Sequence, residues 1–217
     1  MKTVIIFLAF MTLVSRLPAQ APDFKVLTPQ LDRFVRDITL VGRDKRTVRW
    51  LTLPRLEAAS SSPPLKVFVE QSFASITQAT GLVTPGEGVF YVFTGTSREF
   101  ASLEIAQRRQ LKMVGAAGCM YWTNKDQSLK EVLVYVKDSP KDTEELRQHH
   151  LFHNMLAGFG FMNNSPLFPD STFGSNNAFD LRLSPLDIQM ISFCYRHVPP
   201  ASLSSDVSKH LKLNWGK

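Results

Sequence analysis

Apolar residues recur along this chain with two different periods, and the alternation of these periods constrains the fold more than any other feature. Valine occupies every second position of residues 131–137, the spacing of a strand with one buried face. Between residues 63 and 80 the apolar residues instead recur every three or four positions, as in an amphipathic helix. The two patterns follow one another repeatedly, so the sequence predicts an α+β fold.

The same periodicities place the remaining elements. Short runs rich in β-branched or aromatic residues predict strands, and longer amphipathic runs predict helices. Small, polar and proline-containing stretches at residues 58–64 and 162–181 predict loops. The predicted strands are residues 38–41, 47–53, 89–94, 119–123 and 131–137, and the predicted helices are residues 63–80, 97–114, 142–159 and 184–197.

Several helix ends carry specific signals. Pro63-Pro64 suits the first turn of a helix, and Gly81 suits its stop. Ser184-Pro185-Leu186-Asp187 predicts a capping box, in which serine caps the helix and aspartate reaches back. Asp142 or Thr143 can cap the helix before it.

The N-terminus has the three parts of an export signal. Lys2 supplies a positive charge, residues 4–14 form a short apolar run, and Ala19-Gln20-Ala21 forms a small-x-small cleavage site. We therefore expect a cleaved signal peptide over residues 1–21 and a secreted or periplasmic protein. Arg16, close behind the apolar run, leaves an uncleaved anchor as the alternative. No later stretch approaches the length of about 20 apolar residues that a membrane helix needs, so we expect no transmembrane segment after cleavage.

Charge and size narrow the function classes. The net charge of +6 permits a polyanionic partner, but the basic residues are dispersed rather than clustered, which argues against nucleic-acid binding. The length suits one domain, for which we expect residues 36–200, with an extension at 22–35 and a basic tail at 201–217. Cys119 and Cys194 would meet an oxidising compartment, so they form either a disulfide or two buried thiols.

A histidine cluster is the most informative motif. His149 and His153 are four residues apart, so on a helix both imidazoles lie on one face and are candidate ligands for a zinc ion. The segment reads H-H-L-F-H, and His150 replaces the glutamate that activates water in an H-E-x-x-H zinc helix. No glutamate follows Glu145. Third-ligand candidates are Asp170, Asp180, Asp187, His197 and His210.

A second register begins at His153. The segment from His153 to Phe161 has the length and the ending of the H-E-L-x-H-x-L-G-L pattern of metzincin peptidases. In that register Asn154 replaces the glutamate, Ala157 replaces the second histidine, and Asn163 stands at the third ligand position. Alanine cannot ligate a metal, and asparagine cannot take a proton at neutral pH.

Residues 119–200 contain three motifs, Gly160–Ser165, Leu183–Asp187 and Cys194-Tyr195, through which they resemble an uncharacterised family of secreted bacterial proteins with a zincin-like domain. The segment Gly160–Ser165 matches the end of that family's E-E-L-x-Q-x-L-G-L-x-N-D-S helix motif. Leu183–Asp187 matches its L-T-x-L-D motif, and Cys194-Tyr195 matches its Leu-Tyr helix ending. The resemblance implies a single zincin-like α+β domain with a small twisted mixed sheet packed against helices. This chain departs from the family where histidine and asparagine replace the acids of the helix.

Three functional hypotheses follow. The favoured one is a catalytically inactive zincin-like protein that binds a peptide, a protein or a cell-envelope component, with no cofactor. Its degenerate cleft would hold His150, Asn163, Asn164 and Asp187. The alternative is a metal-dependent hydrolase with a non-standard His149/His153 zinc site and His150 as base. A third is a structural or assembly factor recognised through its basic surface.

Overall fold

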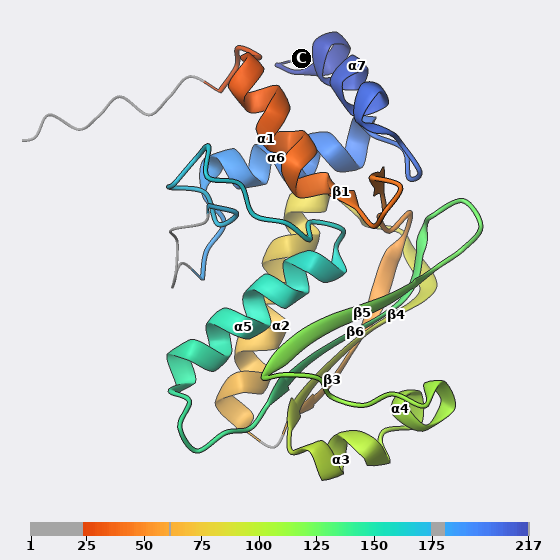
Figure 1. Cartoon of the computed structure of the whole chain (residues 1–217), viewed down its shortest axis with the longest axis vertical. Coiled ribbons are helices and arrows are strands. Elements are labelled where there is room, and N and C mark those ends of the chain that lie inside the picture. The colour runs from red at the N-terminus through yellow and green to blue at the C-terminus, as the bar shows by residue number, and fades with distance from the viewer. Residues whose placement is uncertain (1–23, 61, 175–180, 217) are drawn as a thin grey trace, which may run out of the picture.

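A four-stranded mixed sheet forms the centre of the protein (Figure 1). A computed structural model of the chain describes residues 24–60, 62–174 and 181–216. The predicted signal peptide and Asp180 lie outside these residues. Strands β3 (Leu53–Ser60), β4 (Pro85–Gly95) and β6 (Leu129–Lys137) run parallel, and β5 (Ala117–Thr123) pairs antiparallel with β6. The order across the sheet is β3-β4-β6-β5, which makes β3 and β5 its two edges.

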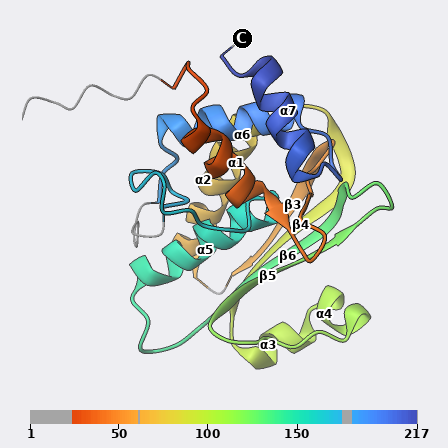
Figure 2. The same cartoon turned by 45° about the horizontal axis from the view of Figure 1, so that its top comes forward.

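Helices cover both faces of this sheet (Figures 1 and 2). On one face lie α2 (Pro63–Thr80) and α5 (Glu144–Gly158), with α6 (Pro185–His197) packed on α2. Phe90, Val132 and Phe159 belong to the large apolar core beneath them. The opposite face carries α3 (Ser97–Ser102) and α4 (Glu104–Arg109) over a smaller apolar cluster. The prediction of an α+β fold with a small mixed sheet packed against helices is confirmed.

Both ends of the described chain pack into the large core. Helix α1 (Pro29–Thr39) buries Phe34 and Ile38, and α7 (Ser204–Asn214) buries Val207 and Leu211. The two helices contact each other. The segments that the sequence set apart as an extension and a tail therefore contribute to the same core.

Several predicted helix ends are confirmed. Helix α2 begins at Pro63 and stops at Gly81, whose φ of 71° is left-handed. Helix α6 begins with the predicted capping box between Ser184 and Asp187. Thr143 caps α5 and accepts a hydrogen bond from the Leu146 amide.

Other boundaries were wrong. The strands predicted at residues 38–41 and 47–53 are reduced to the two-residue strands β1 (Leu40–Val41) and β2 (Arg46–Thr47), while β3 begins at Leu53 and extends into the first three residues of the loop predicted at 58–64. Strand β3 lacks a run of β-branched residues, and its pairing with β4 supplies the backbone hydrogen bonds instead. The helix predicted over 97–114 is broken because Leu103 is extended and Gln110 adopts a left-handed φ of 54°. Of the helices in the described ranges, none is long and apolar enough to cross a membrane.

Candidate functional site

The helix that carries the histidines is held firmly at its C-terminal end. The Trp50 indole donates to the Gly158 carbonyl at 3.0 Å, and the Tyr195 hydroxyl donates to the Phe159 carbonyl at 2.9 Å. These bonds satisfy carbonyls that a helix end leaves without partners. A Cβ on Gly158 would approach Phe90 Cζ to 2.6 Å, and one on Gly160 would approach the Val48 carbonyl oxygen to 2.0 Å. Glycine at these two positions thus allows α5 to end in close contact with the strands and loop beside it.

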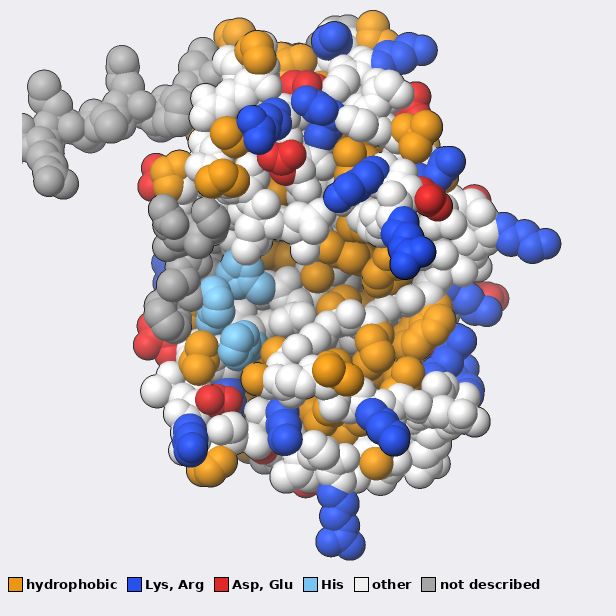
Figure 3. Space-filling view, viewed as in Figure 1, with side chains coloured by type: hydrophobic (Ala, Val, Ile, Leu, Met, Phe, Trp, Pro, Cys, Tyr) orange, Lys and Arg blue, Asp and Glu red, His pale blue; other side chains and the backbone are white. Residues whose placement is uncertain are grey.

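The three histidines of α5 lie at the surface of the molecule. In Figure 3 their pale-blue side chains gather over α5 at one end of a hollow with apolar side chains along it. The ring centroids of His149 and His153 are 4.4 Å apart, whereas those of His149 and His150 are 5.9 Å apart. Burial, and then the neighbouring charge of His150, lower the pKa of His149. His149 and His153 therefore share a helix face, as their spacing predicts.

The candidate third ligands do not lie beside His149 and His153 in the described residues. Asp170 is exposed in a loop, the His197 ring packs against Phe193 at 5.2 Å, and His210 lies on α7. Within residues 24–60, 62–174 and 181–216, no three histidine, cysteine, aspartate or glutamate side chains are placed to share a metal ion. A catalytic zinc site typically uses three protein ligands.

Asp187 is part of the internal framework. Its carboxylate is fully buried and accepts hydrogen bonds from the Ser171 hydroxyl at 2.5 Å, the Thr172 amide at 3.0 Å and the Ser184 amide at 2.8 Å. These contacts fasten the loop before α6 to the first turn of that helix. Asp187 therefore organises the loop and does not face a cleft.

The two asparagines differ in their surroundings. The Asn163 amide donates to the carbonyls of Asp37 at 3.1 Å and Leu40 at 2.8 Å, which ties the loop after α5 to the end of α1. Asn164 is exposed beside it, and both line a shallow surface pocket with Arg36 and Lys45. This pocket lies between α1 and the loop after α5.

The two cysteines are free thiols in this structure. Cys119 lies on β5 and is partly exposed, and Cys194 is buried on α6. Burial raises the pKa of each thiol to about 12. The arrangement corresponds to the alternative of two thiols rather than to a disulfide.

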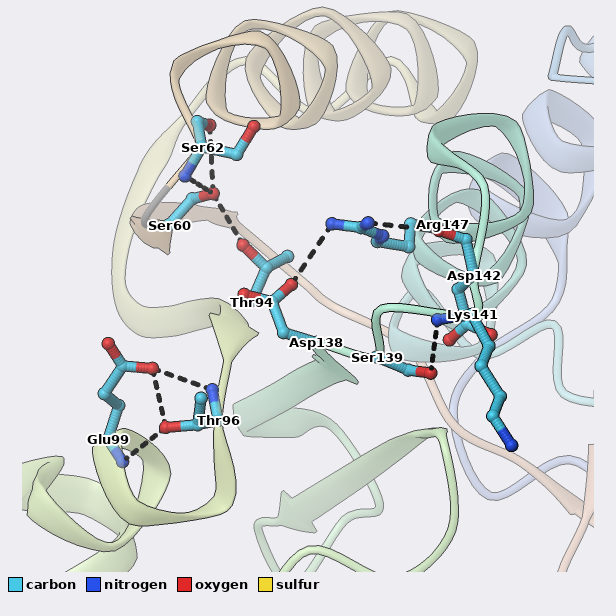
Figure 4. A network of polar contacts seen from close by, with 10 residues as sticks. All are labelled: Ser60, Ser62, Thr94, Thr96, Glu99, Asp138, Ser139, Lys141, Asp142 and Arg147. Carbon is cyan, nitrogen blue, oxygen red and sulfur yellow. Dashed lines mark hydrogen bonds and ion pairs between the residues drawn. The ribbon is translucent and has the colours of Figure 1, made fainter.

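A polar network joins the carboxyl ends of the three parallel strands (Figure 4). The Ser60 and Thr94 hydroxyl oxygens are 2.5 Å apart. The Arg147 guanidinium donates to the Asp138 carboxylate at 3.4 Å and to the Asp142 carbonyl at 3.1 Å. These contacts link the ends of β3 and β4 and join the end of β6 to α5, so the network serves the fold.

Strand β5 is the feature that the sequence analysis did not single out. It lies nearest the viewer in Figure 1, and of the described strands only β6 pairs with it. Cys119 and Tyr121 pack on the large core, and Met120 and Trp122 on the smaller cluster. Its uninterrupted run of uncharged residues without proline, ending a few residues before another strand, was the available signal.

Two arginines stand beside β5 on the face of the smaller cluster. Arg108 and Arg109 both form ion pairs with Glu131 of β6, the Arg108 pair at 2.5 Å. The Arg109 guanidinium also lies over the Trp122 ring, 4.6 Å from its centroid. Trp122 and Glu131 are cross-strand partners, so the arginines, the carboxylate and the indole form one cluster, which we call the Arg109–Trp122 cluster.

Comparisons with protein-family models, with curated proteins and with solved structures each found no match.

Proposed function

We propose that this chain is an exported, catalytically inactive protein that binds an extended peptide segment of a partner along the open edge of β5. The two edges of the sheet carry this proposal. Edge strands expose unpaired backbone groups, and proteins usually protect them with charged residues, with proline or with a covering segment. Strand β3 has Pro54, Arg55 and Glu57, whereas β5 has neither charge nor proline. An unprotected edge is suited to pairing with another strand.

The hydrogen-bond pattern identifies the groups that are available for pairing. The Lys137 amide donates to the Ala116 carbonyl at 2.7 Å, which marks these residues as a hydrogen-bonded antiparallel pair. Hydrogen-bonded and open positions alternate along such a strand. Ala117, Cys119 and Tyr121 therefore point their amide and carbonyl groups away from β6 and toward the open edge.

The surroundings of the edge suit a peptide with alternating side chains. Cys119 and Tyr121 lie against the core on the side of α5, and α5 contacts β5. A peptide paired with β5 would place every second side chain on this side and the others on the opposite side. The hollow in Figure 3, with apolar side chains along it and histidines at one end, supports the first of these contacts.

The chemistry of α5 argues against hydrolysis. A zinc peptidase requires a carboxylate beside the metal-bound water, and the residues between His149 and His153 offer no carboxylate. His150, the base of the hydrolase hypothesis, points about 100° away from His149 around the helix. Zincin-like descent remains part of our proposal and rests on the motif resemblance alone.

Hydrogen exchange provides a direct test of the edge-binding proposal. Peptide binding should slow exchange of the Ala117, Cys119 and Tyr121 amides, which are open in the free protein. Cys119→Pro removes an outward donor at a position where an edge strand tolerates proline, so it should abolish binding, whereas Cys119→Ala should retain it. Unchanged exchange at all three amides in the presence of saturating peptide would refute the proposal.

The second candidate is a metal-dependent hydrolase, favoured by the 4.4 Å separation of the His149 and His153 rings. Elemental analysis of the purified protein, beside a His149→Ala, His153→Ala double variant, separates the two functions. Near-stoichiometric zinc that disappears in the double variant would support the hydrolase. A protein that takes up no zinc after incubation would eliminate it.

Export is tested separately. Cleavage after Ala21 predicts that the mature protein begins at Pro22. N-terminal sequencing of the protein recovered from the periplasm or medium would establish this start. Recovery of the intact N-terminus in the membrane fraction would instead indicate the uncleaved anchor.

A further inference from the structure

The cluster of charges beside β5 indicates which peptide the open edge selects. We propose that the edge prefers acidic peptides, and that Arg109, held over Trp122, recognises a carboxylate on the residue opposite Trp122. This inference rests on the proposed function, because it requires that a peptide pairs with β5.

The strand register places a bound side chain next to this cluster. The alternation that points Tyr121 outward makes the next residue, Trp122, a non-hydrogen-bonded position toward an antiparallel peptide. Side chains at such positions approach most closely, with Cα atoms about 4.5 Å apart. The peptide residue opposite Trp122 therefore projects on the same face as the indole and as the guanidinium that covers it.

Arg109 has the hydrogen-bonding capacity for this role. Only one terminal nitrogen of its guanidinium, Nη2, binds Glu131. Its side chain is 32% exposed, so the cluster remains accessible from solvent. Its Nε is buried, so the N–H groups of the two terminal nitrogens are those that can meet a peptide carboxylate, which the planar guanidinium matches in shape. A carboxylate on the bound peptide is thus the group that best matches the guanidinium N–H donors that do not bind Glu131.

Packing fixes Arg109 before a peptide binds. The ion pair with Glu131 and the contact with the Trp122 ring both restrain its side chain. A restrained side chain loses less conformational entropy on binding than a free one. Lysine and arginine also outnumber acidic side chains over the face that includes the hollow (Figure 3), which favours the approach of an acidic partner.

Three probe peptides test the preference. Each is an acetylated and amidated heptapeptide in which valine alternates with glutamate, glutamine or lysine. We expect the glutamate peptide to bind about five- to tenfold more tightly than the glutamine peptide at low salt, with the difference shrinking as salt rises. The lysine peptide should bind most weakly.

Two variants connect the preference to the cluster. Arg109→Gln should lower the affinity for the glutamate peptide about fivefold and leave that for the glutamine peptide unchanged. Glu131→Gln should raise the affinity for the glutamate peptide, a gain that damage to the fold would not produce. Arg33→Gln removes the same charge from an exposed i,i+4 ion pair on α1 and serves as the matched control.

The outcomes separate this inference from the proposed function. Equal affinity for all three peptides, with the Cys119 amide protected in each complex, would overturn the acidic preference and leave edge binding intact. Equal losses in Arg109→Gln and Arg33→Gln would overturn the role of Arg109. Failure of every peptide to protect the Cys119 amide would overturn both proposals.

Discussion

Replacing Asp187 by alanine tests whether this residue serves the fold or the binding site. The sequence suggested a polar residue of a cleft, whereas the structure buries the carboxylate completely and surrounds it with three donors. The substitution removes the acceptor but leaves the donors in place. Buried donors without acceptors are costly, because they have lost water and gained nothing in exchange.

The size of the effect follows from the three bonds. The Thr172 amide is buried, and its loss of an acceptor costs about 1–3 kcal/mol. The Ser184 amide is partly exposed and loses the aspartate half of the capping box, for which about 1 kcal/mol is typical. The Ser171 hydroxyl loses a charge-assisted bond worth about 1.5–3 kcal/mol. Because such terms overlap, we expect a total loss of about 3–5 kcal/mol in the free energy of unfolding.

Urea denaturation of the mature chain, followed by tryptophan fluorescence, measures this loss. Asp170→Ala is the matched control, because Asp170 is an exposed aspartate of the same loop and should change stability by less than about 0.5 kcal/mol. A loss below about 1 kcal/mol in Asp187→Ala, together with weakened peptide binding, would refute the structural role and return Asp187 to the binding site.

Three further perturbations give distinct results. Gly160→Ala should lower the free energy of unfolding by more than about 2 kcal/mol in a thermal or urea melt, because φ is +94° and the new Cβ would meet the Val48 carbonyl. A decrease of less than about 1 kcal/mol would contradict this geometry. Because the pKa of His149 is lowered in the folded protein, the unfolded chain binds a proton more readily at this position. The free energy of unfolding should therefore fall as the pH drops below about 6.5, and His149→Gln should flatten this dependence. Identical pH profiles of the two proteins would contradict the expectation. A thiol reagent should react slowly with Cys119 and Cys194 in the native protein, because the pKa of each thiol is raised to about 12. After denaturation without reductant, the same reagent should titrate two free thiols. A count of zero would reveal a disulfide.

Local signals in the sequence correctly predicted the helices and strands whose own residues favour the conformation that they adopt in the fold. The capping box at Ser184, the proline start and glycine stop of α2 and the valine alternation of β6 all appear in the structure. Most of strand β3 was missed, and its last three residues were assigned to a loop, because it has no β-branched residues and only pairing with β4 makes it a strand. The residues of a short segment do not reveal which distant strand will pair with it.

The site was predicted less completely than the fold. Helical spacing was sufficient to bring His149 and His153 together, because the relation is local. The local sequence could not indicate that Asp187 would turn inward, since its donors Ser171 and Thr172 lie about fifteen residues away. Nor could it reveal that β5 stands at an edge of the sheet, which depends on the order of all four strands.

The two side-chain hydrogen bonds at the C-terminal end of α5 affect the order in which the protein can fold during synthesis. One donor, Trp50, lies far before α5 in the sequence, and the other, Tyr195, lies well after it. A growing chain that has reached residue 190 already contains every strand of the sheet but lacks the Tyr195 hydroxyl. The helix beside the β5 edge therefore becomes fully anchored only after Tyr195 has been synthesised and has packed against it. A nascent or truncated chain that stops before Tyr195 would therefore expose β5 while the neighbouring end of α5 still lacks one of its two side-chain hydrogen bonds.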